Sequence, residues 1–234
     1  MTNGFPNQPK TLRGAFVEYG LTLPPAIVVF QFNPLQLTRN RSLTYTAPSS
    51  GTSGAAAAGG QTLRSFHKRY DDLTELRDAQ QVTVGEETIG FDIRLDATDQ
   101  LDEGDPLAEQ FGILPRLSTL EAMVYPKDES LLGQALGALL GSPGGFSFTR
   151  AANPPLILFI WGRTRVLPVN INSMNITETE FSAVLNPVRA TVAVSLTVIE
   201  GKSPFYLYSK AAKEAMSVLN LANLGDISDV VVPG

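Results

Sequence analysis

Few residues of this chain are of the types that do catalytic chemistry. His67 is the only histidine among the 234 residues, and there is no cysteine. Disulfides, thiolate metal sites and cysteine nucleophiles are therefore excluded, and a Ser-His-Asp triad would depend on His67 alone. Because Phe66 and Lys68 flank this histidine and no second imidazole exists, we interpret it as a surface or packing residue.

The other chemical patterns are equally weak. Ser65 and Lys68 match a Ser-x-x-Lys pattern, but the companion motifs of that catalytic class are missing. The glycine-rich stretch 51–60 has neither the Lys-Ser/Thr ending of a phosphate loop nor the spacing of a dinucleotide-binding turn. We therefore expect no catalytic, cofactor-binding or metal-binding residues and no cofactor.

Carboxylates gather in one segment, as Asp99, Asp102, Glu103 and Asp105. Their spacing does not fit an EF-hand loop, so we interpret them as the solvated start of a helix, where negative charge suits the helix dipole. A pair of carboxylates could also hydrolyse a glycoside, but nothing in the sequence selects such a pair. A hydrolase domain stays open as an alternative of a different class.

The charge and composition of the chain indicate which classes of partner to expect. The net charge is −5, and 43% of the residues are hydrophobic, which is an ordinary globular balance. A general nucleic-acid partner is not expected, because phosphate contacts require a basic surplus. The first ten residues do not resemble a secretory signal, and the apolar segment 154–161 is too short to span a bilayer, so we expect cytoplasmic folding without membrane insertion.

Strand patterns dominate the chain. Segments 11–19, 26–32, 41–46, 156–161, 165–171 and 174–181 are rich in aromatic and β-branched residues. The clearest strand is 188–199, where apolar residues alternate with small polar ones. Segment 81–97 predicts a hairpin, with Val82 and Val84 on one arm, Phe91 on the other, and a turn at 85–88.

Helices and loops complete the pattern. Asp105-Pro106 is a typical helix start, and an apolar stripe follows as Leu107, Phe111, Leu114, Leu117, Leu120 and Val124. Pro115 lies inside it, so the helix either kinks there or begins there. A flexible loop is expected at 48–61, an insertion at 126–153 with a short helix at 128–140, and a mostly helical segment at 203–224.

Four segments, in order, resemble the tube-type proteins of contractile injection systems, which are related to contractile phage tail proteins. The first is Phe30-Gln31-Phe32-Asn33-Pro34, which is similar to the Phe-x-Phe-Asn-Pro strand end of that family. The second is the Leu-Pro-x-Leu helix within 112–120. The third is the segment 154–162, with a Pro-Pro pair, an apolar strand and Trp-Gly. The fourth is Phe181 followed by Pro187-Val188-Arg189-Ala190 and the long alternating strand.

The resemblance implies a mainly β fold with α: a tube-protein-like β-barrel or sandwich, with a flanking helix and a C-terminal helix. It implies a domain at 1–200, followed by a helical extension and tail at 201–234. It also implies a homo-hexameric ring that connects the inner tube to the baseplate and spike or hub proteins and templates tube polymerisation. The LysM module of the adaptor members is missing here, which leaves open the layer that the subunit occupies.

Two further alternatives remain: the main inner-tube protein of the same machinery, and a monomeric barrel that binds a small ligand. The insertion at 126–153 and the C-terminal helix argue against the main tube protein. A ring contact requires two different complementary surfaces on each subunit. The residues that we expect at subunit interfaces are Phe30, Phe32, Asn33, Pro34, Trp161, Arg189, Thr191, Ser195 and Thr197, and the small polar side chains of the last strand are expected to face the lumen.

Overall fold

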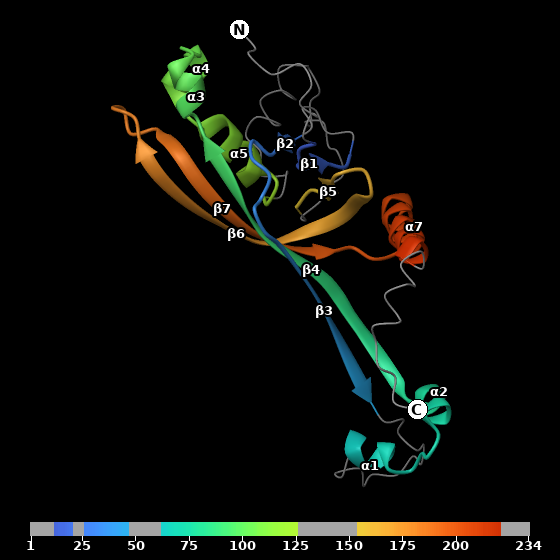
Figure 1. Ribbon diagram of the computed structural model, residues 1–234. Helices are drawn as coiled ribbons and strands as arrows, with labels where there is room; N and C mark the ends of the chain where they lie inside the picture. Colours follow the sequence, from blue (N-terminus) through green and yellow to red (C-terminus); the bar gives the residue numbers. More distant parts are fainter. Residues whose placement is uncertain (1–11, 21–25, 47–61, 126–153, 221–234) are drawn as a thin grey trace, which may run out of the picture. The chain divides into compact units, whose positions relative to one another are not determined.

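The computed structural model describes residues 12–20, 26–46, 62–125 and 154–220 (Figure 1). The chain divides into two compact units. The first unit comprises Met1–Thr38 and Ile89–Gly234, and the second comprises Arg39–Thr88. The expected loop at 48–61, the insertion at 126–153 with its short helix, and the last residues of the expected extension lie outside the described residues.

One open sheet of seven strands organises the described chain. The order across the sheet is β2-β1-β5-β6-β7-β4-β3. The bounds are β1 Ala15–Glu18, β2 Ile27–Val29, β3 Leu37–Thr46, β4 Gln81–Asp96, β5 Ile157–Trp161, β6 Arg165–Phe181 and β7 Pro187–Val198. The expected class, mainly β with helices, is confirmed. The sheet is not closed: β2 and β3 lie at its two edges.

Strand β7 has the clean alternation that its sequence predicts. Ala190, Val192 and Leu196 are buried on one face, and Thr191 and Ser195 are half-buried on the other. The strand pairs antiparallel with β6 along nearly its whole length, from Val198 opposite Val169 to Pro187 opposite Phe181. A sheet with one apolar face and one polar face follows directly from this period of two.

Strand β6 corrects the expectation of two strands at 165–171 and 174–181. It is continuous from Arg165 to Phe181, and its register with β7 shifts between Ile171 and Ser173. One extra residue, Asn172, is accommodated there, as in a β-bulge. The Asn172 Nδ2 donates a hydrogen bond to the Thr197 Oγ1 at 2.6 Å, so the irregularity that resembled a break is held inside the sheet.

Strand β4 corrects the predicted hairpin at 81–97. The segment is a single strand of 16 residues without a turn at 85–88. Gly85 is there because a Cβ at this position would lie 2.3 Å from the Ser42 Oγ of β3. In the first half of β4 the apolar side chains occupy even-numbered positions, and in the second half they occupy odd-numbered positions, because they lie on opposite faces of the strand. This change has the same sequence pattern as the two arms of a hairpin.

The core lies in the first unit and is built around four phenylalanines. The rings of Phe16, Phe30, Phe91 and Phe159 have centroid separations between 5.1 and 6.5 Å. Aliphatic residues from β4, β6, β7 and the helix α5 (Leu114–Ala122) surround them. Aromatic pairs of this kind stabilise a core beyond the burial of their area, so the four rings contribute strongly to its stability.

The helical segment after β4 is divided into three: α3 (Thr98–Asp102), α4 (Pro106–Phe111) and α5. Asp105 caps α4, with its carboxylate accepting from the Leu107 amide at 3.0 Å, as the sequence predicts. The break comes at Gly112, whose φ is 57°, and α5 begins with Pro115 in its first turn. The predicted apolar stripe is therefore not one face: Leu117 and Leu120 are buried, but Leu107 is exposed.

The C-terminal helix α7 (Pro204–Leu219) packs on the first residues of β6. The buried Ser209 hydroxyl donates to the Val166 carbonyl at 2.8 Å and accepts from the Val166 amide at 2.9 Å. It therefore satisfies both backbone groups of this β6 residue, as a neighbouring strand would. Helix α7 and strand β6 belong to the same compact unit. The expected boundary at residue 200 stays a prediction.

The second unit is a two-stranded ribbon of β3 and β4 residues with two short helices. They are α1 (Leu63–His67) and α2 (Leu73–Ala79). Thr62 and Asp72 cap them through their side-chain oxygens, and the buried Phe66 makes an edge contact with Tyr70 at 5.2 Å. Two helices thus occupy a segment whose sequence pattern is ambiguous.

Candidate subunit interface

Arg189 is the centre of a polar network at one end of the first unit. Its Nε donates to the Asp96 Oδ2 at 2.7 Å, and its Nη1 donates to the Glu180 Oε1 at 2.6 Å. Its Nη2 donates to the Thr98 hydroxyl at 3.2 Å. One guanidinium from β7 therefore joins the last residue of β4, the start of α3 and the end of β6.

Asp96 is held as an anion. Burial acts to raise the pKa of the Asp96 carboxyl, but hydrogen bonds from Thr98 and the charge of Arg189 outweigh burial and leave the pKa lowered. The hydrogen bonds to Asp96 raise the pKa of Arg189 in turn. A general acid for hydrolysis needs a raised pKa, so Asp96 does not suit that role.

Gln31, which follows the edge strand β2, is also part of the network. Its side-chain amide pairs with the backbone of Asp96 in both directions, at 2.7 and 3.0 Å. Arg116 of α5 donates to the same Gln31 oxygen at 2.8 Å. Gln31, Asp96 and Arg116 are not among the residues predicted from the sequence. The Asp-x-Thr pattern at 96–98, which is typical of a capped turn, could have indicated Asp96.

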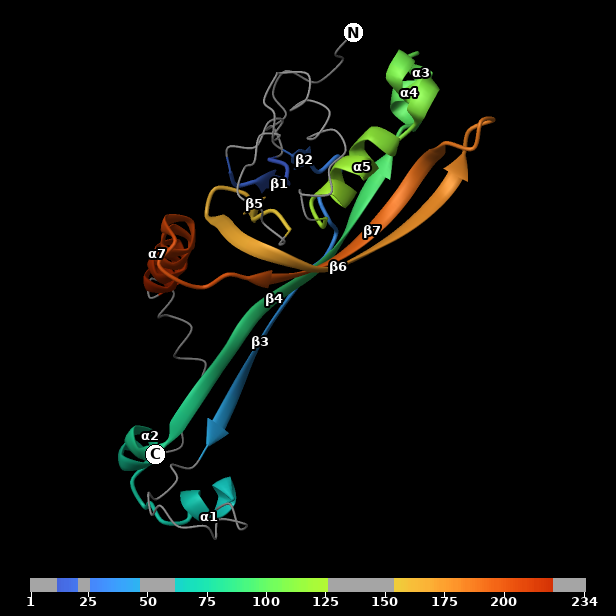
Figure 2. The same cartoon turned by 180° about the vertical axis from the view of Figure 1, so that it is seen from behind.

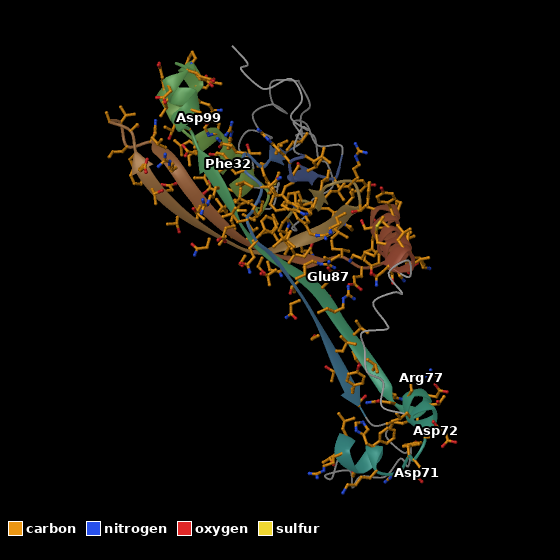
Figure 3. The ribbon with its side chains drawn as sticks, viewed as in Figure 1. Phe32, Asp71, Asp72, Arg77, Glu87 and Asp99 are labelled. Carbon is orange, nitrogen blue, oxygen red and sulfur yellow. The ribbon has the colours of Figure 1, made fainter. Side chains whose placement is uncertain are left out.

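The expected interface residues around the Phe-Asn-Pro motif separate in the structure. Phe30 is a fully buried residue of the subunit core, and its expected place at an interface stays a prediction. Asn33 fastens the chain entering β1, because its Oδ1 accepts from the Gly14 amide at 3.0 Å and its Nδ2 donates to the Leu12 carbonyl at 2.8 Å. Pro34 is half-buried beside it, and Phe32 has an exposed ring (Figure 3).

The remaining expected residues lie along the sheet. Trp161 is half-buried and stacks on Phe159 with centroids 6.0 Å apart, so most of its contact is with the core. Thr191, Ser195 and Thr197 share the polar face of β7, as their spacing predicts. Their assignment to a lumen stays a prediction.

The residues considered for catalysis are not brought together. The His67 Nε2 lies 3.4 Å from the Gln80 Nε2 on an exposed part of the second unit. The Ser65 hydroxyl donates to the Thr62 carbonyl at 2.8 Å within the first turn of α1. Within the described residues no three His, Asp or Glu side chains gather in a way that suits a metal ion.

The ribbon of the second unit carries exposed apolar side chains. Leu43, Tyr45, Val82 and Val84 are each between 44% and 53% exposed. Gly85 lies against Ser42, and of the four apolar residues two follow Ser42 on β3 and two precede Gly85 on β4. We call this set the ribbon face.

The ribbon also contains a buried carboxylate. Glu87 is 2% exposed, and both Arg39 and Arg41 of β3 bind it, with the Arg41 Nη2 at 3.1 Å from the Glu87 Oε2. The two arginines lie two residues apart, so they project from the same side of their strand. This ion cluster supports the ribbon where apolar packing is sparse.

The chain matches no protein-family model and no curated protein. Among the helices described, none has both the length and the apolar character to cross a membrane.

Proposed function

We propose that this protein is a structural subunit of a contractile injection system, in a ring that connects the inner tube to the baseplate and spike. The ring would provide the layer from which the tube polymerises. Two lines of support meet here: the ordered resemblance of four segments to tube-type proteins, and a surface that suits contact with another chain.

The observation that carries the proposal is the ribbon face. Four large apolar side chains are half exposed on a two-stranded ribbon, and one of its strands, β3, lies at a sheet edge. Soluble monomers usually protect such edges with charges, bulges or prolines, because exposed edges pair with other chains. An edge strand that exposes large apolar side chains is useful when a neighbouring subunit covers it.

The first unit supplies a rigid support for such a contact. Its core is dense in aromatic residues, and the Arg189 network ties the ends of β4, β6 and β7 to α3. A ring subunit acts through geometry, so a well-packed sheet with defined edges is the property that the function requires.

The test is the mass of the purified protein in solution, together with electron micrographs after mixing with tube and baseplate proteins of the same system. The expected result is a ring of several copies or incorporation at one end of a tube. Replacement of both Leu43 and Val84 by threonine should weaken this assembly, whereas Thr83→Ser, which leaves the four apolar side chains in place, should not. A protein that joins neither rings nor tubes at any concentration would overturn the proposal.

A further inference from the structure

A group of large apolar side chains is exposed at one end of the first unit. They come from the β6–β7 turn and from α4, and their exposed fractions lie between 40% and 80%: Leu107, Phe111, Phe181, Val184 and Leu185. Two hydrogen bonds hold the two segments together, from the Asn186 Nδ2 to the Gln110 carbonyl at 2.6 Å and from the Ile113 amide to the Pro187 carbonyl at 3.0 Å. The patch is therefore a built surface.

The backbone of the turn is strained in a way that presents one of these side chains. Leu185 has a φ of 64° and is the most exposed of the group. A leucine rarely adopts this left-handed conformation, and glycine would adopt it without cost. The Ser182 amide donates to the Asn186 carbonyl at 2.8 Å and fixes the turn. An exposed leucine kept in a glycine conformation points to a function for its side chain.

Carboxylates surround this patch. Between Arg94 and Arg116 the sequence has no basic residue, and the acidic residues of that stretch besides Asp96 are Asp99, Asp102, Glu103, Asp105 and Glu109. They lie on and around α3 and α4, where Figure 3 labels Asp99. Glu178 and Glu180 add two carboxylates at the end of β6, and Arg189 binds the second of them. We call this surface the acidic end.

The opposite end of the first unit has the reverse character. Strand β6 starts there and reaches the acidic end 17 residues later, a distance of about 55 Å at about 3.3 Å per residue. Figures 1 and 2 show α7 beside the start of β6 and α3 and α4 beside its end. The basic residues of this end are Arg163, Arg165, Lys202, Lys210 and Lys213; its nearby acidic residues are Glu200 and Glu214.

This basic end also exposes apolar side chains. They belong to α7, and they are Leu207, Tyr208, Met216, Val218 and Leu219. The Tyr208 hydroxyl donates to the Arg163 carbonyl at 2.8 Å, which joins the helix to the β5–β6 turn and sets its basic residues beside the apolar ones. Each end of the unit thus has an apolar centre, and the charges around the two centres are opposite in sign.

We propose that the acidic end of one copy docks on the basic end of the next copy, in a head-to-tail contact. The inference rests on the proposed ring and names the pair of surfaces that would close it. A contact between two different surfaces of identical chains generates a ring when the rotation closes. Apolar centres with charged rims have the usual anatomy of an interface, and complementary rims steer association and fix its direction.

The experiment exchanges the charges of the two ends. One variant, Asp102→Lys with Glu103→Lys, removes much of the negative charge of the acidic end, and a second, Arg163→Glu with Lys202→Glu, removes the positive charge of the basic end. The lysines lie at the end of α3 and one glutamate precedes α7, so all of these helix charges suit the local dipoles and should not disturb folding. Asp92→Lys with Arg94→Glu, on the exposed face of β4, is the control.

Each variant alone should associate at least about tenfold more weakly than the natural protein, because the charges of the two ends are then less complementary and the new charges face like charges. A 1:1 mixture of the two, and the variant that combines all four changes, should recover association. Sedimentation at low and at high salt measures this, and the natural contact should weaken as salt screens it.

Two results would overturn the head-to-tail contact. In one, the natural protein forms rings that neither variant weakens; the ring function then stands without this interface. In the other, the natural protein stays monomeric at low salt, and co-assembly with tube and baseplate proteins then decides the proposed function separately. Circular dichroism confirms that each variant is folded before it is scored.

Discussion

At the scale of single residues, three of the residues expected at subunit interfaces make contacts within the subunit. Phe30 fills the aromatic core, Asn33 fastens the start of β1, and Arg189 joins three strands and a helix. Alternation in the sequence predicted the buried face of β7, because it depends only on neighbouring positions. The partners of Arg189 could not be predicted in this way, since Asp96 is 93 residues distant in the chain.

Asp96→Asn should reduce the free energy of unfolding by about 1–2 kcal/mol at neutral pH, because the anion that accepts from Arg189 and Thr98 is lost. The pKa of Asp96 is lowered in the folded state, so its stabilisation is complete above its ordinary value of about 3.9 and disappears as the pH falls through the folded value. Urea unfolding at neutral and acidic pH measures both effects.

The control for this variant is Asp78→Asn, which breaks the exposed pair between Arg77 and Asp78 at 2.8 Å. Its effect should stay below about 0.5 kcal/mol because water screens exposed charges. An equal loss for the two variants, or a loss for Asp96→Asn that does not shrink as the pH falls below the ordinary pKa of an aspartate, would contradict the role assigned to Asp96.

Gly112→Ala should destabilise the protein by more than about 2 kcal/mol. The residue has a φ of 57°, and a Cβ there would lie 2.2 Å from the Pro187 carbonyl oxygen. Gly162→Ala is the matched control, because Gly162 has a φ of 71° but no atom within 4 Å of the added carbon. Only about 1 kcal/mol of conformational cost is expected for the control. Thermal unfolding of both variants compares them, and equal losses would show that the contact with Pro187 is unimportant.

At the scale of elements, the strength of the local signal decided what could be predicted. Strands β5 and β7 and the start of α4 carry complete patterns, and each was located within a residue or two. Strand β4 was predicted as a hairpin, because Gly85 and the change in the positions of its apolar residues resemble a turn. In the structure, Gly85 is explained by its contact with β3. A glycine required by a neighbouring strand has the same sequence pattern as a glycine required by a turn.

Glu87→Gln should loosen the ribbon locally. The variant keeps the shape of the side chain but leaves Arg39 and Arg41 without the carboxylate that they bind. Amide hydrogen exchange in the ribbon should accelerate by about tenfold, while the midpoint of global unfolding should change little, since the core lies in the first unit. Glu86→Gln, at an exposed neighbouring position, should change neither measurement. Faster exchange spread evenly over the chain would argue against a local role.

At the scale of the whole molecule, the apolar core and the ribbon face belong to different units. The apolar core is formed by residues of the first unit, whereas the ribbon face belongs to the second. A protein that acts as one member of an assembly needs both properties, and neither could be read from the spacing of residues along the chain. Which side chains remain exposed depends on distant strands, and the sequence pattern of Val82 and Val84 is the same in a core as on a surface.

This separation predicts that the ribbon can be shortened without unfolding the first unit. Ser42 and Gly85 lie opposite each other, so residues 43–84 can be replaced by Asn-Gly, the preferred two-residue connection between antiparallel strands. We expect cooperative unfolding with a midpoint within about 5 °C of the natural protein, because no buried side chain of the phenylalanine core is removed. The same variant should assemble more weakly, because the ribbon face is gone while the acidic and basic ends remain. Calorimetry and sedimentation on one sample measure the two properties together. Loss of the cooperative transition would show that the ribbon supports the core, and assembly of unchanged strength would show that the ribbon face is not a subunit contact.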